Sequence, residues 1–245
     1  MRLNHSSLVA CLVIYCSSAG VAQAAPSWVV TDTIELGRYL HAYEAKLGAL
    51  KDYVLRSTIS SYHNTTDAMP AEVERTTLWK MGDRMRSEAF GVITVQDNTL
   101  RVTVDAEERM IMLSVPEGSL SMADAGTRTI MFLAAQQVRK TTDPLGVRFQ
   151  LTFPKAATYS TLELVFDKQG WLRSMTTCWA RPIIVEPGNP LSDQVLPKVR
   201  VDLTEPGPIG QKVELDIAKL VDRKAAQLRG VGAYADFEVY DTRTP

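Results

Sequence analysis

The sequence predicts an α+β fold with one large antiparallel curved sheet, a half-open β-barrel of about eleven strands, and three helices on its concave side. Short runs of alternating apolar and polar residues fill most of the chain. The breaks inside the main group of runs span only two to five residues, which suits hairpins and excludes parallel crossovers. Helical patterns stand between groups of strands, and an open sheet of this size curls.

Residues 1–24 have the pattern of a secretory signal peptide. An apolar run, Leu8–Tyr15, is followed by small residues that end in Ala22-Gln23-Ala24, so we expect cleavage after Ala24. The run is short of the roughly 18 to 20 residues of a membrane-spanning helix, and no later run matches it. The sequence therefore predicts a periplasmic or secreted protein with no transmembrane span, in which residues 25–245 form a single domain.

Composition is that of an ordinary globular protein: 245 residues, 45% hydrophobic and 22% charged, with a formal net charge of −1. Electrostatic binding of nucleic acid is not expected, because no basic patch is present. Cys178 is the one cysteine outside the signal segment, so no intramolecular disulfide is expected and a buried thiol is the simplest interpretation.

The mature chain opens with a capped amphipathic helix. Asp32 has a capping pattern with Glu35 three residues on, and an apolar stripe at steps of four and three follows; the stripe consists of Leu36, Leu40, Tyr43, Leu47 and Leu50. The stripe fits equally a lid over a cavity and a plain packing helix. A half-buried strand, Tyr53–Tyr62, comes next.

The centre of the chain predicts an antiparallel meander. Its five alternating runs are separated by turn residues such as glycine and Asp-Asn; the runs are Val73–Met81, Met85–Phe90, Val92–Val95, Leu100–Val104 and Met110–Val115.

The second half predicts two more helices and further strands. The helices are expected at Thr129–Lys140 and Val213–Arg229, from apolar residues at helical spacing. The strands are expected at Val147–Phe153, Leu162–Phe166, Trp171–Trp179, Lys198–Thr204 and a last run that ends at Tyr240. Between them, Arg181–Pro197 contains too many prolines for a sheet interior and predicts a surface loop.

No motif indicates catalysis or a bound cofactor, and we expect neither. The chain has no Gly-x-Ser-x-Gly elbow, phosphate-binding glycine loop or dinucleotide fingerprint. His41 and Glu44 on one helix, with His63, form at best a weak metal site; a surface histidine beside an acidic residue is the favoured interpretation, so no metal is expected.

The unusual feature of the sequence is a set of flexible and aromatic apolar residues. Methionine adapts to irregular ligands, so such a set is typical of a lipid-accepting cavity. An ordinary core between sheet and helices explains the same residues. The candidate ligand-binding residues are Trp79, Met81, Met85, Met110, Met112, Phe149, Phe166 and Trp171.

The order of these elements resembles the family of periplasmic lipoprotein carriers with the LolA/LolB-like fold, which includes RseB-type stress regulators. The resemblance is carried by Leu78–Glu88, Ile93–Val102 and Leu162–Met175, behind the amphipathic helix and first strand, and covers Asp32–Thr204. It implies an unclosed β-barrel whose apolar concave face is covered by helices and accepts acyl chains. Residues 213–240 do not resemble the ending of the carriers.

The resemblance also implies residues that contact a lid. The lid-locking arginine of the family maps onto Arg84 or Arg86, and the helix would contribute Leu36, Leu40 and Tyr43.

Two functions are therefore predicted. The first is an exported, non-catalytic envelope protein that binds an acyl chain, a lipid or a lipidated protein in an apolar half-barrel cavity. The alternative is an adaptor or sensor module that contacts another envelope protein through its convex sheet or the 181–197 loop and has no ligand cavity.

Overall fold

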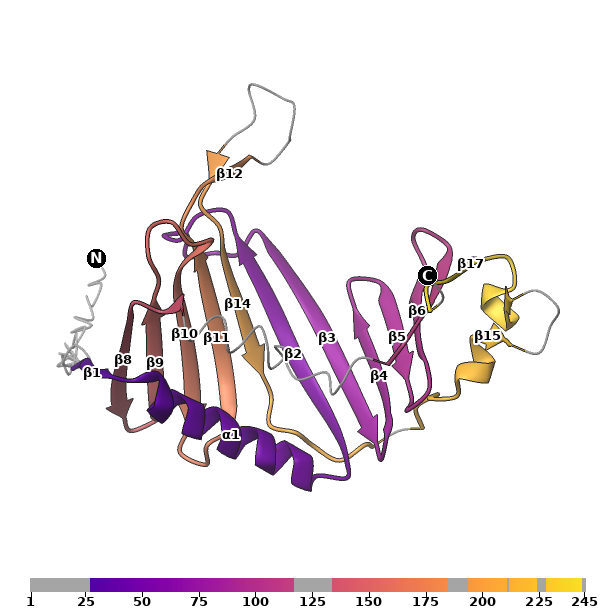
Figure 1. The fold of residues 1–245 in the computed structure, drawn as a ribbon, viewed down its shortest axis with the longest axis horizontal. Coiled ribbons are helices and arrows are strands. Elements are labelled where there is room, and N and C mark those ends of the chain that lie inside the picture. Colours follow the sequence, from indigo (N-terminus) through magenta and orange to yellow (C-terminus); the bar gives the residue numbers. More distant parts are fainter. Residues whose placement is uncertain (1–26, 117–133, 185–193, 211, 224–227, 244–245) are drawn as a thin grey trace, which may run out of the picture.

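The computed structural model describes residues 27–116, 134–184, 194–210, 212–223 and 228–243. Their main element is one open sheet of thirteen strands (Figure 1). The first seven strands are β1 (Val29–Thr31), β2 (Asp52–Tyr62), β3 (Glu72–Met81), β4 (Arg84–Ala89), β5 (Val92–Gln96), β6 (Arg101–Asp105) and β7 (Met110–Ser114). The others are β8 (Gln137–Asp143), β9 (Gly146–Thr152), β10 (Tyr159–Asp167), β11 (Leu172–Trp179), β14 (Lys198–Leu203) and β17 (Glu238–Asp241).

The strand order is β1-β8-β9-β10-β11-β14-β2-β3-β4-β5-β6-β7-β17. Two meanders, β2 to β7 and β8 to β11, are joined by β14, which pairs with β11 on one side and β2 on the other. All neighbours are antiparallel except β17, which pairs parallel with β7. The two edge strands, β1 and β17, lie at opposite ends of this order, so the sheet is open.

Two short ladders stand outside the sheet. β12 (Ile183–Ile184) pairs with β13 (Gln194–Val195), within the proline-rich stretch. This ladder extends beyond the ends of the strands β11 and β14 (Figure 1). β15 (Val221–Asp222) pairs with β16 (Arg229–Gly230) near the C-terminus. Two 3₁₀ turns, Ile217–Lys219 and Gly232–Tyr234, flank this second ladder.

The prediction of three helices is wrong, because the described residues contain one α-helix, α1 (Thr33–Ala49). The predicted helix Thr129–Lys140 lies partly outside the described residues, and its last four residues belong to β8. The predicted helix Val213–Arg229 is replaced by a 3₁₀ turn and the β15–β16 ladder; residues 224–227 lie outside the described residues. The molecule is therefore mostly β, and the predicted strands agree with observed ones to within a few residues.

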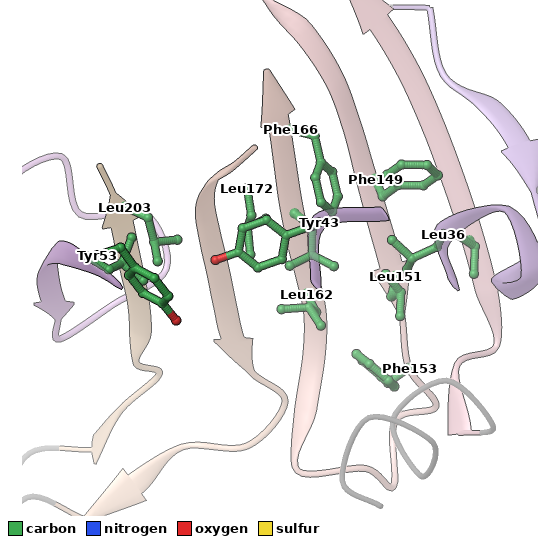
Figure 2. Close-up of a cluster of buried hydrophobic side chains, with 13 residues drawn as sticks. Leu36, Tyr43, Tyr53, Phe149, Leu151, Phe153, Leu162, Phe166, Leu172 and Leu203 are labelled. Carbon is green, nitrogen blue, oxygen red and sulfur yellow. The ribbon is translucent and has the colours of Figure 1, made fainter. Parts of the chain in front are cut away.

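α1 forms for the reasons that its sequence indicates. The Asp32 carboxylate accepts a hydrogen bond from the Glu35 backbone N–H at 2.8 Å and so caps the first turn. Leu36 and Tyr43 are buried against the sheet, and Figure 2 shows both lying over side chains from the strands. The helix crosses the β8 to β11 half of the sheet (Figure 1).

Charged contacts hold α1 at its two ends. Near its start, Lys140 of β8 donates to Glu35 at 2.5 Å. Near its end, the Lys46 ammonium donates to the backbone carbonyl of Gln169 and lies 5.4 Å from the ring centre of Trp171. Between these attachments, Leu36, Tyr39 and Tyr43 of the helix pack on apolar residues of the sheet.

The sheet carries two separate hydrophobic cores. The core under α1, called the α1 core, consists of Leu36, Tyr43, Tyr53, Leu55, Val138, Phe149, Leu151, Phe153, Leu162, Leu164, Phe166, Leu172 and Leu203. The second, called the C-terminal core, consists of Val95, Leu100, Val102, Val104, Ile111, Leu113, Ile217, Leu220 and Val221. In the second core, the segment after β14 packs onto β5, β6 and β7.

The two cores lie on opposite faces of the sheet. Residues paired across neighbouring strands point to the same face, and successive residues alternate. Leu55 on β2 belongs to the α1 core. Going from each residue to its partner on the next strand, through β3, β4, β5 and β6, leads from Leu55 to Met112 on β7, so these residues share one face. The adjacent residue Val54 points to the other face. The same path from strand to strand leads from Val54 to Leu113 on β7, which belongs to the C-terminal core. The C-terminal segment therefore covers the face that α1 leaves open.

Candidate functional site

The three aromatic residues Phe149, Phe166 and Trp171 are packed against α1. The Tyr39 ring of the helix lies 5.1 Å from that of Phe149 and 5.5 Å from that of Phe166. Tyr43 meets Trp171 edge to face at 6.2 Å. Phe149 and Phe166 are completely buried, so the helix fills the space above them in this structure (Figure 2). Burial also raises the pKa of the Tyr43 hydroxyl to about 12.

The residues implied to contact a lid divide between the two faces. Leu36, Leu40 and Tyr43 of α1 belong to the α1 core or pack against it. Arg86 pairs with Trp79, on the face opposite α1, and Arg84 shares its side of β4. Neither arginine is therefore placed to lock α1.

The other predicted ligand-binding residues are dispersed. Trp79 is buried on the face opposite α1, and Met81 is exposed at the end of the same strand. Met85 is buried on β4, while Met110 and Met112 are half-buried on β7, on the same face as α1 but outside its core. The eight residues thus occupy three places, and their contact with a ligand stays a prediction.

A groove on the face opposite α1 brings together residues that the sequence analysis missed. It has a volume of about 410 Å³ and lies between β2, β3, β4 and the segment that follows β14; it is lined by Arg56, Thr77, Trp79, Arg86, Glu88, Lys212, Val213 and Glu214. The sequence signal was the alternation along β2 to β4. This alternation shows which residues of one strand share a face. The register of the strands is needed as well to show that the polar residues lie on the same face as Trp79.

Arg86 is fixed in this groove by three hydrogen bonds. Its Nε and Nη2 atoms donate to one Glu88 carboxylate oxygen at 2.9 and 2.6 Å. Its Nη1 atom donates to the backbone carbonyl of Glu214 at 3.2 Å. These bonds tie the C-terminal segment to β4 and hold the guanidinium in one orientation.

The described ranges contain no group of three potential metal ligands. His41 and Glu44 lie on α1, whereas His63 is exposed in the loop after β2. Among these residues, none of the helices is long and apolar enough to cross a bilayer. Cys178, at the end of β11, is partly exposed and not fully buried as expected.

Comparison with known proteins identifies no family. No family model and no curated protein matches the sequence. Among solved structures, an uncharacterized conserved protein from Thermus thermophilus is similar at 13% identity over 84% of this chain and 99% of the other, with a TM-score of 0.41. A DUF1329 family protein from Desulfovibrio piger is similar at 11% identity over 77% and 97%, with a TM-score of 0.26. Scores this low carry no argument about fold or function.

Proposed function

We propose that the protein is an exported, non-catalytic envelope protein that binds the acyl chain of a lipid or a lipidated protein against the α1 core. α1 acts as a cover that moves aside. The observation that supports this is the construction of the cover: apolar side chains of α1 pack on the sheet, while the ion pair of Glu35 and the hydrogen bond of Lys46 lie near the two ends of the helix. Release of these attachments would free the helix to lift.

A bound acyl chain would replace apolar contact that the sheet loses when the helix lifts. Burial contributes roughly 0.8 kcal/mol per CH₂ group, so an acyl chain of about a dozen carbons recovers on the order of 10 kcal/mol of apolar contact. The aromatic rings of Phe149 and Phe166 and the leucines around them offer a surface without charged groups. Such a surface suits a ligand that has length but no fixed shape.

The test weakens the attachments of the cover and leaves the apolar side chains of the layer unchanged. In Lys46→Ala/Lys140→Ala, both attachments are lost, and we expect the uptake rate of a fluorescent fatty acid to rise severalfold. Arg200→Ala is the control, because it removes an exposed ion pair with Asp202 on β14 on the opposite face. Equal rates in the double variant and the wild type would contradict a moving cover.

Native mass spectrometry of the protein purified from its host supplies the second readout. We expect a co-purifying lipid and a mature chain that begins at Ala25. A mass without lipid, together with a stable protein partner, would overturn the proposal in favour of an adaptor that works through protein contacts.

A further inference from the structure

The groove on the face opposite α1 has an excess of positive charge. Three cations, Arg56, Arg86 and Lys212, line it together with two carboxylates, Glu88 and Glu214. Arg86 forms an ion pair with Glu88 at 2.6 Å and compensates its charge. The Glu214 carboxylate accepts the backbone N–H of Asp216 at 3.0 Å and is thereby occupied in shaping its own turn.

Arg56 and Lys212 remain as cations without an ion pair in the described part of the chain, and the three cations and two carboxylates of the lining leave the groove a net charge of +1. Within the described ranges, neither side chain has an ion pair or a hydrogen-bonding partner, and both residues are exposed. They come from different elements, since Arg56 belongs to β2 and Lys212 to the segment after β14. An anion bound between them would be attracted electrostatically by both positive charges.

Arg86 adds prepared hydrogen-bond donors. A guanidinium has five N–H groups. Three are used by Glu88 and Glu214, and the other two have no acceptor among the residues that the structure describes. The Arg86 side chain is only 15% exposed, so these two donors are largely removed from water while their orientation is already fixed. Unused donors in such a setting favour an oxygen anion.

We propose that this groove binds the oxyanion of a small ligand, a phosphate or carboxylate group, between Arg56, Arg86 and Lys212. Trp79, which also lines the groove, offers its indole to the apolar part of the ligand next to the anion. The volume of about 410 Å³ lies in the range of small-molecule sites. The groove is on the other face from the α1 core, so it is independent of the acyl-chain proposal.

The experiment is a calorimetric titration of the full mature chain with inorganic phosphate, glycerol 3-phosphate and propionate. We expect the wild type to bind at least one of them, more weakly as salt is raised. Arg56→Gln and Lys212→Gln should each weaken binding about tenfold, because each removes one charge that faces the anion. Both positions are exposed, so folding, checked by circular dichroism, should persist.

The matched control is Arg200→Gln. Arg200 pairs with Ser60 and so lies on the same face as Arg56, but outside the groove. It removes one positive charge from the chain and should leave binding unchanged. If Arg200→Gln and Arg56→Gln weaken binding equally, the effect is due to the net charge of the chain, and the proposed site is overturned. The absence of binding to all three probes would also overturn it.

A vesicle assay distinguishes the two sources of a phosphate group. If the ligand is a lipid headgroup, the wild type should bind vesicles that contain phosphatidic acid, not pure phosphatidylcholine vesicles, and Arg56→Gln should lose this binding. If the ligand is a free phosphate compound, the titration succeeds and both vesicle types fail. A lipid found by mass spectrometry in Arg56→Gln would not bear on the groove, because the acyl-chain site lies elsewhere.

Discussion

Gly146 illustrates how a single residue sets the spacing of the strands around it. It begins β9 after the tight turn from β8, and the Asp143 carboxylate accepts its backbone N–H at 3.1 Å. A side-chain Cβ at this position would lie 2.0 Å from the backbone carbonyl oxygen of Phe166. Glycine is required because β10 approaches too closely for any side chain.

Gly146→Ala should therefore destabilise the fold by about 3 kcal/mol or more, since the obstacle is backbone and the strands must separate. Chemical denaturation measures the change. Gly37→Ala is the comparison: Gly37 lies inside α1, and nothing lies within 4 Å of the place that a Cβ would take there, so alanine should stabilise the helix by up to about 1 kcal/mol. Equal and small effects at both positions would contradict the close approach at Gly146.

Among the elements, α1 was predictable and the other two proposed helices were not. α1 has a capping aspartate and a long apolar stripe, two local signals that agree. In Val213–Arg229, apolar residues also recur at helical spacing, but Ile217, Leu220 and Val221 reach the C-terminal core through a 3₁₀ turn and a short ladder. Spacing alone does not distinguish a helix from an irregular segment that buries the same residues.

β8 shows the second reason for the error. The helix predicted to end at Lys140 overlaps this strand at its last four residues, Gln137–Lys140. The element is nevertheless a strand because it pairs along its whole length with β9, and with β1 on its other side. Such pairing is non-local and is not recorded in the periodicity of one segment.

The attachment of α1 to β8 makes the stability of the protein depend on pH. The Lys140 side chain, with a smaller contribution from Thr31, lowers the pKa of Glu35 below its ordinary value of about 4.5. A lowered pKa in the folded state stabilises the fold above that ordinary value, and the contribution disappears as the pH falls through the folded-state pKa.

Glu35→Gln should accordingly cost about 0.5 kcal/mol at pH 7, within the range typical of an ion pair near the surface, and less at pH 2. Thermal unfolding at both pH values provides the measurement. Lys140→Gln removes the partner and should reproduce the same pattern. A deficit of Glu35→Gln that persists undiminished at pH 2 would mean that the glutamate acts through packing and not through its charge.

At the scale of the whole molecule, the two cores on opposite faces of the sheet should contribute independently to the free energy of unfolding. The α1 core and the C-terminal core share no residue and lie on opposite faces of different strands. Substitutions at distant sites without common partners add within about 0.5 kcal/mol. The sequence indicated one curved sheet around a single core, because alternation reveals that a strand has an apolar face but not which face neighbouring strands share.

Leu151→Ala should cost about 2–5 kcal/mol and Ile111→Val about 0.5–1.5 kcal/mol, and the double variant should lose the sum. Leu151 belongs to the α1 core and Ile111 to the C-terminal core, and both are fully buried. Urea unfolding gives all three values. Tyr39→Ala with Phe149→Leu is the positive control, since these rings touch and their effects should deviate from additivity. A comparable deviation for the first pair would show that the two cores are coupled.

The late position of β14 in the chain has a consequence for its synthesis. The seam between the two meanders stays unfilled until residues 198–203 arrive, so a nascent chain that ends earlier presents the bare edges of β2 and β11. Unpaired edges of this kind associate with other chains. Those edges need shielding while the chain is being made, and a chaperone that holds extended segments should be found on chains truncated before residue 198.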